Sequence, residues 1–408
     1  MLLTKSNITD FISEQTYDIR NTHNGRWIDQ KCAADVLTVI ADCILNYVGN
    51  TAEINSFTTK DIWFSDLAKA TIKEVFKKPN TDEYLAKNEY DKFFQQPMEL
   101  LAASNVLSKK KNGNKNVYFI SNFDVLQYIA LREKNALFFL KEYITKTLKD
   151  CGIYDLFDTF FKDQTPQNYA KMKRGFSQFT IENTAINGIT ECNRIFIKVL
   201  NPLSYYNNAL GTKRGYLSKH NITYDMLMYN RNNFRDINAE KPKEMTRKEY
   251  MKLRKIKVND AFSKYQSLKA KHYLRLFNDQ YRESKSEHYD ELCCGVATQV
   301  HHIFPECQYP EISYYLENLI ALTPSQHMTK AHPNNNTREI CEEYQHLLLL
   351  SKTNRIKENL TDEKVERIYE FSKLLYVLNI GFNDDNILNI DNFDFPAVVS
   401  AINLYYSA

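Results

Sequence analysis

The amino-acid sequence predicts an α+β protein that is mostly helical. The chain of 408 residues contains only 10 glycines and 10 prolines, well below the usual ~7% and ~5%, so few positions interrupt a helix. Apolar side chains recur at helical spacing over several long stretches, whereas signals for extended chain are confined to short segments. The length allows two or three domains. We expect four regions, which comprise residues 1–163, 164–288, 289–352 and 353–408.

Three helices are expected in the first hundred or so residues. Apolar residues repeat at helical spacing over Ile28–Val48, a second helix begins at a Thr58-Thr59 cap, and a third spans Tyr90–Leu107. The Asn112-Gly113 pair that follows lies between two extended arms, which is a strong hairpin signal. Three helices followed by a hairpin have the outline of a winged helix. The alternative is a plain helical domain with a solvated turn.

Positive charge gathers at the tip of this hairpin and in two later segments. The later segments are a basic turn at Thr212–Gly215 and the stretch Lys241–Arg275, in which tyrosines interleave with lysines and arginines. Such segments are candidates for contact with the phosphates of a nucleic acid, and a solvated face is the alternative for each. The candidate residues are Lys109, Lys110, Lys111, Lys115, Lys213, Arg214, Arg247, Lys248, Arg254 and Lys255.

The rest of the chain is mainly helical in pattern. Aromatic residues recur at core spacing over Phe123–Phe161, and the chain becomes polar after Asp163, where we place a boundary. The run Arg194–Leu203, RIFIKVLNPL, is expected to be a strand. Further helices are expected over Glu342–Lys357 and over Thr361–Leu378, the second capped by its first residue.

Composition excludes several classes of protein. The formal net charge is only +3, so the overall charge does not indicate nucleic-acid binding. No apolar run approaches the ~18–20 residues of a membrane span, and no secretion signal begins the chain, so a soluble cytoplasmic protein is expected. The eight cysteines form no C-x-x-C pair and are expected to be reduced thiols. An irregular zinc site is a minor alternative for Cys293, Cys294, Cys307 and Cys341.

Four of the nine histidines fall within Thr298–Pro333, which is the candidate site. His301 and His302 close a β-like run, and a helix that carries His327 follows a second such run. Imidazole is a common ligand of transition metals and a neutral base near pH 7. Adjacent histidines in a regular strand point to opposite faces. Both can serve one site only if the strand ends at this pair, and Pro305 is consistent with such an ending.

The start of the following helix can be predicted from its first residues. Thr323-Pro324-Ser325-Gln326 provides threonine at the N-cap, proline at the first helical position and glutamine at the third, which is a capping box. His327 then lies near the positive end of the helix dipole, which favours a neutral imidazole. His332 lies five residues further on, about 140° around an α-helix, so it is the weaker candidate.

The order of these residues resembles the HNH nucleases, whose ββα-metal unit binds a phosphodiester against one divalent cation. His301, His302, Asn318 and His327 carry the resemblance, and the separation of Asn318 from His327 is typical of the family. The resemblance implies that His301 and His327 bind the metal and that His302 is the general base. It also implies that the amide of Asn318 bridges backbone groups of the loop that presents the base.

The resemblance also bears on the metal and on the last histidine. Colicin-type members of the family add a ligand four residues after the helical histidine, but Ala331 occupies that position here. His332 is therefore an auxiliary candidate, for a phosphate contact or a structural role. The implied cofactor is a divalent ion, with Mg²⁺ the first expectation and Mn²⁺, Ni²⁺ or Zn²⁺ the alternatives.

The layout of the whole chain resembles HNH-type type II restriction endonucleases of bacteria, in which a large recognition portion accompanies a small cleaving unit. The resemblance implies sequence-specific cleavage of double-stranded DNA, leaving 5′-phosphate and 3′-hydroxyl ends. Residues 1–163 would recognise DNA, 164–288 would contact it, 289–352 would cleave it, and 353–408 would form a helical C-terminal region. A cognate DNA methyltransferase would be a genetic rather than a physical partner, and a homodimer is a candidate assembly.

Two alternatives to a restriction enzyme remain open from the sequence. The first is a homing nuclease or another defence nuclease of the HNH type. The second belongs to another class of protein, a DNA-binding regulator whose HNH unit is structural and inactive. Incubation of a plasmid with magnesium separates the two classes, because a regulator yields no discrete fragments.

Overall fold

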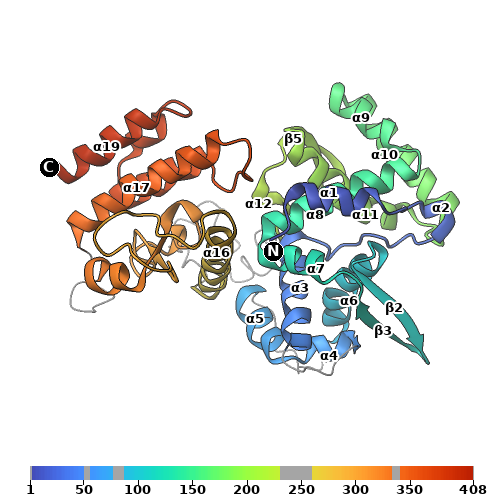
Figure 1. Cartoon of the computed structure of the whole chain (residues 1–408). Helices are drawn as coiled ribbons and strands as arrows, with labels where there is room; N and C mark the ends of the chain where they lie inside the picture. Colours follow the sequence, from blue (N-terminus) through green and yellow to red (C-terminus); the bar gives the residue numbers. More distant parts are fainter. Residues whose placement is uncertain (1, 50–55, 77–86, 230–259, 333–340, 408) are drawn as a thin grey trace, which may run out of the picture. The chain divides into compact units, whose positions relative to one another are not determined.

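The computed structural model describes residues 2–49, 56–76, 87–229, 260–332 and 341–407. Within these ranges the protein is mostly helical, with small antiparallel sheets (Figure 1), which confirms the expected mostly helical α+β class. The chain forms two compact units. The N-terminal unit is Leu3–Tyr250, and the C-terminal unit is Met251–Ala408 together with Met1–Leu2. No helix among the described residues is long and apolar enough to cross a membrane.

The N-terminal unit is built around helix α3, whose first half is buried from Ala34 to Ala41. Helices α5, α6, α7 and α8 pack against it. The helices of this unit are α1 (Lys5–Ser13), α2 (Ile19–Thr22), α3 (Ala34–Gly49), α4 (Thr59–Trp63), α5 (Asp66–Phe76), α6 (Lys87–Ala103), α7 (Phe123–Leu131), α8 (Glu133–Asp150), α9 (Tyr154–Lys162), α10 (Pro166–Asn183), α11 (Ile189–Tyr206) and α12 (Tyr224–Leu227). The predicted cap of the second helix is confirmed, because Thr58 and Asp61 form a capping box at the start of α4.

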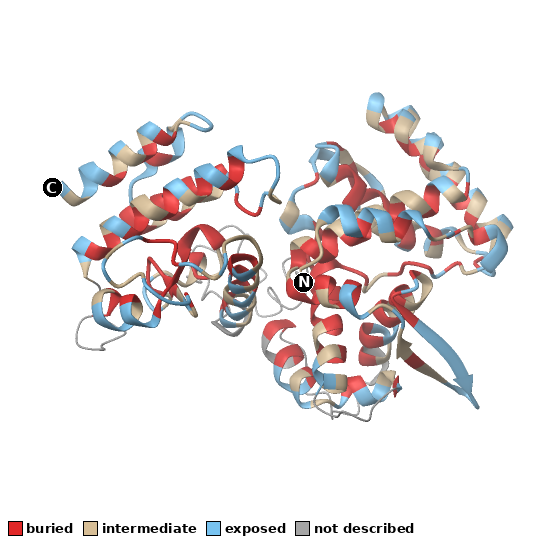
Figure 2. Cartoon of the chain, viewed as in Figure 1, coloured by how far each residue is buried: buried red, intermediate tan, exposed pale blue. Residues whose placement is uncertain are grey.

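The predicted hairpin is confirmed as strands β2 (Leu107–Asn112) and β3 (Lys115–Ile120), which extend away from the helices of their unit (Figure 1). The turn consists of Gly113 and Asn114, and Gly113 has a φ of 60° that favours glycine. A short strand β1 (Phe57–Thr58) pairs with β3 to give the order β1-β3-β2. Strand β2 is exposed beyond its first residue (Figure 2).

The expected strand at Arg194–Leu203 is wrong, because this segment lies within helix α11. Its apolar residues Ile195, Phe196, Val199 and Leu200 recur at helical spacing and are buried on one face. This spacing outweighs the β propensity of the branched side chains. The helix leads into a second hairpin, β4 (Leu210–Lys213) and β5 (Tyr216–Asn221).

The C-terminal unit contains a two-stranded sheet backed by a long helix, with further helices after it. Helix α16 packs against both strands, β6 and β7, and α17 packs against α19. The elements are α16 (Asp260–Tyr281), β6 (Gln299–His302), η2 (Pro310–Ile312), η3 (Leu316–Asn318), β7 (Leu319–Leu322), η4 (Gln326–Ala331), α17 (Glu342–Thr361), α18 (Phe371–Phe382), η6 (Asp385–Asn389) and α19 (Phe395–Ser407).

The expected cap at Thr361 is also wrong, because this residue is the last of α17 rather than the start of the next helix. Its hydroxyl donates to the carbonyl of Lys357 at 2.9 Å, a bond to the preceding turn that threonine often makes within a helix. Helix α18 begins only at Phe371.

The two compact units differ from the four regions expected from the sequence. The boundary at residue 163 falls inside the N-terminal unit, because α9 and α10 pack together and the rings of Phe157 and Phe176 meet edge-on at 6.3 Å. The boundaries at 288 and 352 fall inside the C-terminal unit. There, Glu287 and Lys352 form a buried ion pair with 3.2 Å between Oε2 and Nζ. Composition shifts along the chain do not reveal such packing.

Candidate metal centre

The β6–β7 hairpin presents the first two histidines of the candidate site. Strand β6 pairs with β7 so that His301 lies opposite Ile320 and His302 lies opposite Leu319. The strand ends at His302, as expected. One further bond joins the two segments beyond it, from the backbone N–H of Ile303 to the carbonyl of Asn318 at 2.9 Å. The two adjacent side chains make separate sets of contacts, which agrees with the alternation of a strand.

The helix that follows β7 begins with the predicted capping box. The backbone N–H of Gln326 donates to Oγ1 of Thr323 at 3.2 Å, and the N–H of Thr323 donates to Oε1 of Gln326 at 3.1 Å. Gln326 is fully buried, and its amide also donates to the carbonyl of His288 and to Asp290 at 3.0 and 2.8 Å. These bonds fix the start of the helix against the chain that precedes β6.

The segment Gln326–Ala331 is a π-helix rather than an α-helix. A π-helix joins residues i and i+5 by hydrogen bonds, so residues five apart come to the same side. His327 and His332 are five apart, and their ring centroids lie 4.7 Å from each other. An α-helix would place His332 away from His327, which made it the weaker candidate. The π-helix instead brings the two rings together.

Three imidazoles converge at one point of the C-terminal unit. The ring of His301 lies 5.2 Å from that of His327 and 4.9 Å from that of His332, centroid to centroid. Each of the three residues offers one ligand nitrogen, and these nitrogens all lie within 4.8 Å of one another. Among the described residues this is the group of His, Cys, Asp and Glu side chains that could hold a metal ion. We refer to these three residues as the histidine triad.

The electrostatics of the triad suit a metal ligand. Burial lowers the pKa of His301 well below its ordinary value, and the neighbouring imidazoles lower it further. Burial and then His332 lower the pKa of His327 to about 4. Both rings are therefore neutral near pH 7, with lone pairs available. The buried Nδ1 of His327 has no hydrogen-bond partner among the described residues, a cost that a bound cation would remove. These features fit a divalent transition metal.

His302 lies outside the triad and has partners of its own. Its Nε2 is 3.0 Å from the carbonyl oxygen of Ser313 and 3.0 Å from Oγ of Ser267 on α16. Because a carbonyl oxygen can only accept, Nε2 carries the proton and Nδ1 keeps the lone pair. Burial, followed by the charge of Lys271, lowers the pKa of His302 to about 3. The imidazole is thus a fixed neutral group with its acceptor nitrogen defined.

Asn318 makes the hydrogen bonds that the resemblance implies. Its Oδ1 accepts from the backbone N–H of Phe304 at 2.8 Å, and its Nδ2 donates to the carbonyls of Phe304 and Ile312 at 2.9 and 3.3 Å. The side chain is fully buried. Asn318 therefore holds the loop that follows His302, and Gln345 of α17 supports the same loop by donating to the carbonyl of Ile303 at 2.7 Å.

Two residues of α16 belong to this site, although the sequence did not single them out for it. Ser267 contacts His302, and Lys271 follows four residues later, so both lie on one face of the helix. The half-buried ammonium of Lys271 lowers the pKa of His301, His302 and His327. The four-residue spacing is the one signal that could have indicated this face. Nothing in the sequence indicates Ser313, whose carbonyl is the other partner of His302.

The basic residues predicted to contact DNA differ in whether they are paired or exposed in the structure. Lys109 forms an ion pair with Glu99, whereas Lys110, Lys111 and Lys115 are exposed on the β2–β3 hairpin. Lys213 and Arg214 are exposed at the turn of the β4–β5 hairpin. The other predicted basic residues lie outside the described part of the chain; they are Arg247, Lys248, Arg254 and Lys255.

The zinc site considered for the cysteines is not formed by the described residues. All the cysteines described have free thiols. Within the described ranges, none of the four candidate cysteines belongs to a group of His, Cys, Asp and Glu side chains that could hold a metal ion. Those cysteines are intermediate or exposed, and they are Cys293, Cys294, Cys307 and Cys341.

The lowered histidine pKa values predict a stability that falls with acid in the metal-free protein. The unfolded chain takes up protons below a pH of about 6.5, whereas His327 and His302 do so only near pKa values of about 4 and about 3. Stability is therefore fully present above pH ~6.5 and falls towards pH ~4, each histidine contributing up to ~1.4 kcal/mol per pH unit. Urea unfolding in EDTA at pH 7.5 and 5.0 measures this change in the free energy of unfolding.

A matched pair of variants separates this effect from other titrating groups. His302→Leu should reduce the loss of stability between the two pH values, whereas His220→Leu, at an exposed position of β5, should leave it unchanged. An equal loss of stability in both variants would contradict the assignment to His302.

Comparisons with models of known protein families, with curated proteins and with solved structures found no match for this chain. The geometry of the site is therefore the basis for assigning a function.

Proposed function

We propose that this protein is a metal-dependent DNA endonuclease of the HNH type that cuts double-stranded DNA in a sequence-specific manner, as type II restriction enzymes do. The observation that carries the proposal is the convergence of His301, His327 and His332 within 4.8 Å, between their ligand nitrogens. The strand–strand–helix order around the triad, and the bridging amide of Asn318, also support it.

The donor set favours certain metals in the proposed site. Three neutral imidazole nitrogens suit Zn²⁺ or Ni²⁺, whereas Mn²⁺ and Mg²⁺ prefer oxygen ligands, and Mg²⁺ keeps several waters. We therefore expect Zn²⁺ or Ni²⁺ to support activity better than Mg²⁺, the first expectation from the sequence. A divalent ion held by the triad would supply positive charge to the phosphate and to the departing 3′ oxygen.

The protein's own side chains would perform the remaining steps. His302, with its lone pair at Nδ1, accepts a proton from the attacking water. Ser313 and Ser267 hold the ring in this orientation through its Nε2. Asn318 fixes the loop after the base, and Lys271 offers an ammonium to the phosphate undergoing attack. Cleavage then leaves 5′-phosphate and 3′-hydroxyl ends.

The N-terminal unit supports the DNA-binding part of the proposal. Its order of helix α3, strand β1, helices α4 to α6 and hairpin β2–β3, with the sheet order β1-β3-β2, resembles a winged helix with one additional helix. The exposed lysines of the hairpin, Lys110, Lys111 and Lys115, are suited to phosphate contacts.

Incubation of supercoiled plasmid and linear phage DNA with the full chain tests the proposal. With Mn²⁺, Ni²⁺, Zn²⁺ or Mg²⁺ supplied separately, we expect discrete fragments whose sequenced ends share a common motif. EDTA should abolish cleavage. Binding of DNA without any cleavage under all four metals would instead favour a regulator with a structural unit.

Replacing Lys271 by alanine should move cleavage and metal affinity in opposite directions. The rate of cleavage should fall by about 10²-fold, because a preorganised charge on the phosphate is lost. The affinity of the triad for Zn²⁺ should rise, because the ammonium repels a second cation nearby. Single-turnover cleavage and isothermal titration measure the two effects. Lys264→Ala, at an exposed position of the same helix, is the matched control, and a weaker Zn²⁺ affinity in Lys271→Ala would indicate a structural role.

A further inference from the structure

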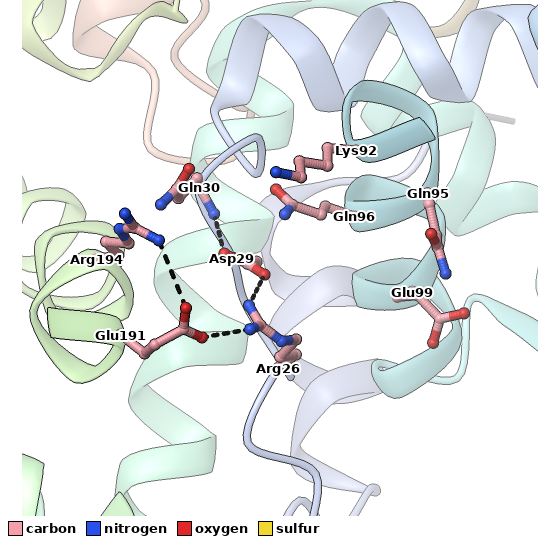
Figure 3. A pocket seen from close by; sticks show the side chains of 9 residues that line it. All are labelled: Arg26, Asp29, Gln30, Lys92, Gln95, Gln96, Glu99, Glu191 and Arg194. Carbon is pink, nitrogen blue, oxygen red and sulfur yellow. Dashed lines mark hydrogen bonds and ion pairs between the residues drawn. The ribbon is translucent and has the colours of Figure 1, made fainter. Parts of the chain in front are cut away.

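A polar recess with a volume of about 360 Å³ lies in the N-terminal unit, away from the histidine triad in the sequence (Figure 3). Three segments line it: helix α6, residues 26–30 between α2 and α3, and the start of α11. These segments bring together side chains that are more than 160 residues apart in the sequence, such as Arg26 and Arg194. The metal centre and its mechanism make no use of this recess.

Helix α6 presents one polar face to the recess. Lys92, Gln95, Gln96 and Glu99 follow the spacing i, i+3, i+4, i+7, which places them on one side of the helix. The opposite side is buried in the core of the unit through residues such as Phe93, Phe94, Met98 and Leu101. The polar face is therefore fixed in orientation by the packing behind it.

The opposite wall of the recess is held by a chain of ion pairs. Arg26 donates to Asp29 at 2.6 Å and also pairs with Glu191, which lies 3.5 Å from Arg194 (Figure 3). Asp29 is buried, with 3% of its surface exposed, so it is a firm anchor for the guanidinium of Arg26. The recess contains three cationic and three anionic side chains, a balance unsuited to a site for phosphate alone.

Several polar side chains of the recess are open to solvent and so are accessible to a ligand. The side chains of Gln30, Lys92 and Gln95 make no hydrogen bond to other described residues, although all three line the recess. Gln96 uses Oε1 to accept from the backbone N–H of Lys31 at 2.9 Å, which directs its amide group and leaves its two donors for a ligand. The amide of Gln96 is therefore fixed, whereas the exposed side chains of Lys92 and Gln95 can adjust to a ligand.

The recess is also joined to the basic hairpin. Glu99, the last polar residue of the α6 face, accepts hydrogen bonds from Asn116 at 3.0 Å and from Tyr118 at 2.6 Å, both on strand β3. It also pairs with Lys109 of strand β2. These contacts fix the hairpin relative to α6, so phosphate contacts by the hairpin would set the register of a duplex on the helix face.

We propose that this recess reads base edges of the DNA, with Lys92 and Gln95 as the main specificity-determining residues. The proposal rests on the proposed function, for which it names the recognition surface. Lysine and arginine bind guanine edges and glutamine binds adenine edges, while acidic side chains accept from cytosine. A charge-balanced set of such groups, beside a hairpin that supplies positive charge for phosphates, fits sequence readout better than uniform backbone binding.

Selection from a random library of DNA duplexes tests the proposal without requiring cleavage. The full chain in EDTA is mixed with the library, and the bound duplexes are sequenced over several rounds. We expect wild-type protein to enrich a defined sequence, and Gln95→Ala and Lys92→Ala to lose discrimination at one or more positions by about tenfold. Gln178→Ala, at an exposed position of α10 in the same unit, is the matched control and should retain the full preference. Circular dichroism and thermal unfolding confirm that each variant is folded.

The outcomes separate this inference from the proposed nuclease activity. An unchanged preference in both recess variants, or no enriched sequence with the wild type, overturns the readout proposal even if the protein cleaves DNA. A preference that depends on Gln95 supports the readout proposal even if cleavage fails with every metal. In that case only the proposed nuclease activity is contradicted.

Discussion

Replacing His302 by alanine will abolish cleavage while metal binding and DNA binding persist. His302 is outside the triad, and its Nε2 is bonded to Ser313 and Ser267, so removing its ring takes away a base and no metal ligand. Loss of general-base catalysis typically costs 10²–10⁴-fold in rate, and we expect a value near the upper end. Single-turnover cleavage gives the rate, isothermal titration with Zn²⁺ gives the metal affinity, and gel shift in EDTA gives the DNA affinity.

A second variant distinguishes loss of the general base from loss of the folded structure. His302→Gln places an amide N–H at the reach of Nε2, so it keeps a side-chain donor for the carbonyl of Ser313 but has no nitrogen lone pair to accept a proton. It should be folded and equally inactive, whereas His220→Ala at an exposed position of β5 should cleave like the wild type. Retained cleavage in both His302 variants would remove the proposed base.

Replacing His332 by alanine will weaken binding of Zn²⁺ or Ni²⁺ by at least about 100-fold. Loss of a residue that merely orients a ligand costs 10–100-fold in metal affinity, so loss of a ligand should reach or exceed the upper value. The expectation depends on the π-helix, which brings the ring of His332 to 4.7 Å from that of His327. Cleavage should fall in parallel when metal is limiting.

Titration of the metal into the full chain measures this effect, and Met328→Ala is the matched control. Met328 is an exposed residue of the same π-helix, so its truncation should leave metal affinity unchanged. If His332→Ala binds Zn²⁺ as tightly as the wild type, two histidines hold the ion and His332 has another role.

Local chemistry made part of this fold predictable from the sequence. The capping residues Thr58 and Thr323 act through bonds to residues three positions away, and the β2–β3 turn depends on Gly113. Such features lie within a few residues, where spacing and residue type suffice. The pair His301 and His327 was likewise indicated by its order in the chain, and the two rings do meet.

Other features depend on contacts that the sequence does not display. The strand expected over residues 194–203 is wrong, because branched residues suit a strand but burial of one helical face decides the outcome. Ser267 meets His302 across 35 positions, and the recess assembles from three distant segments. The sequence favours His332 less than the other histidines because it does not reveal that the turn before this residue is a π-helix.

The π-helix has a consequence for how such centres are recognised in other sequences. Deleting a single residue between the two histidines of this segment would restore the ordinary helical repeat and still leave the rings on a common side, four positions apart. Two different local geometries can therefore deliver an equivalent pair of donors. A search pattern that demands one fixed interval would miss the other geometry, so a pattern for this kind of centre should accept intervals of both four and five.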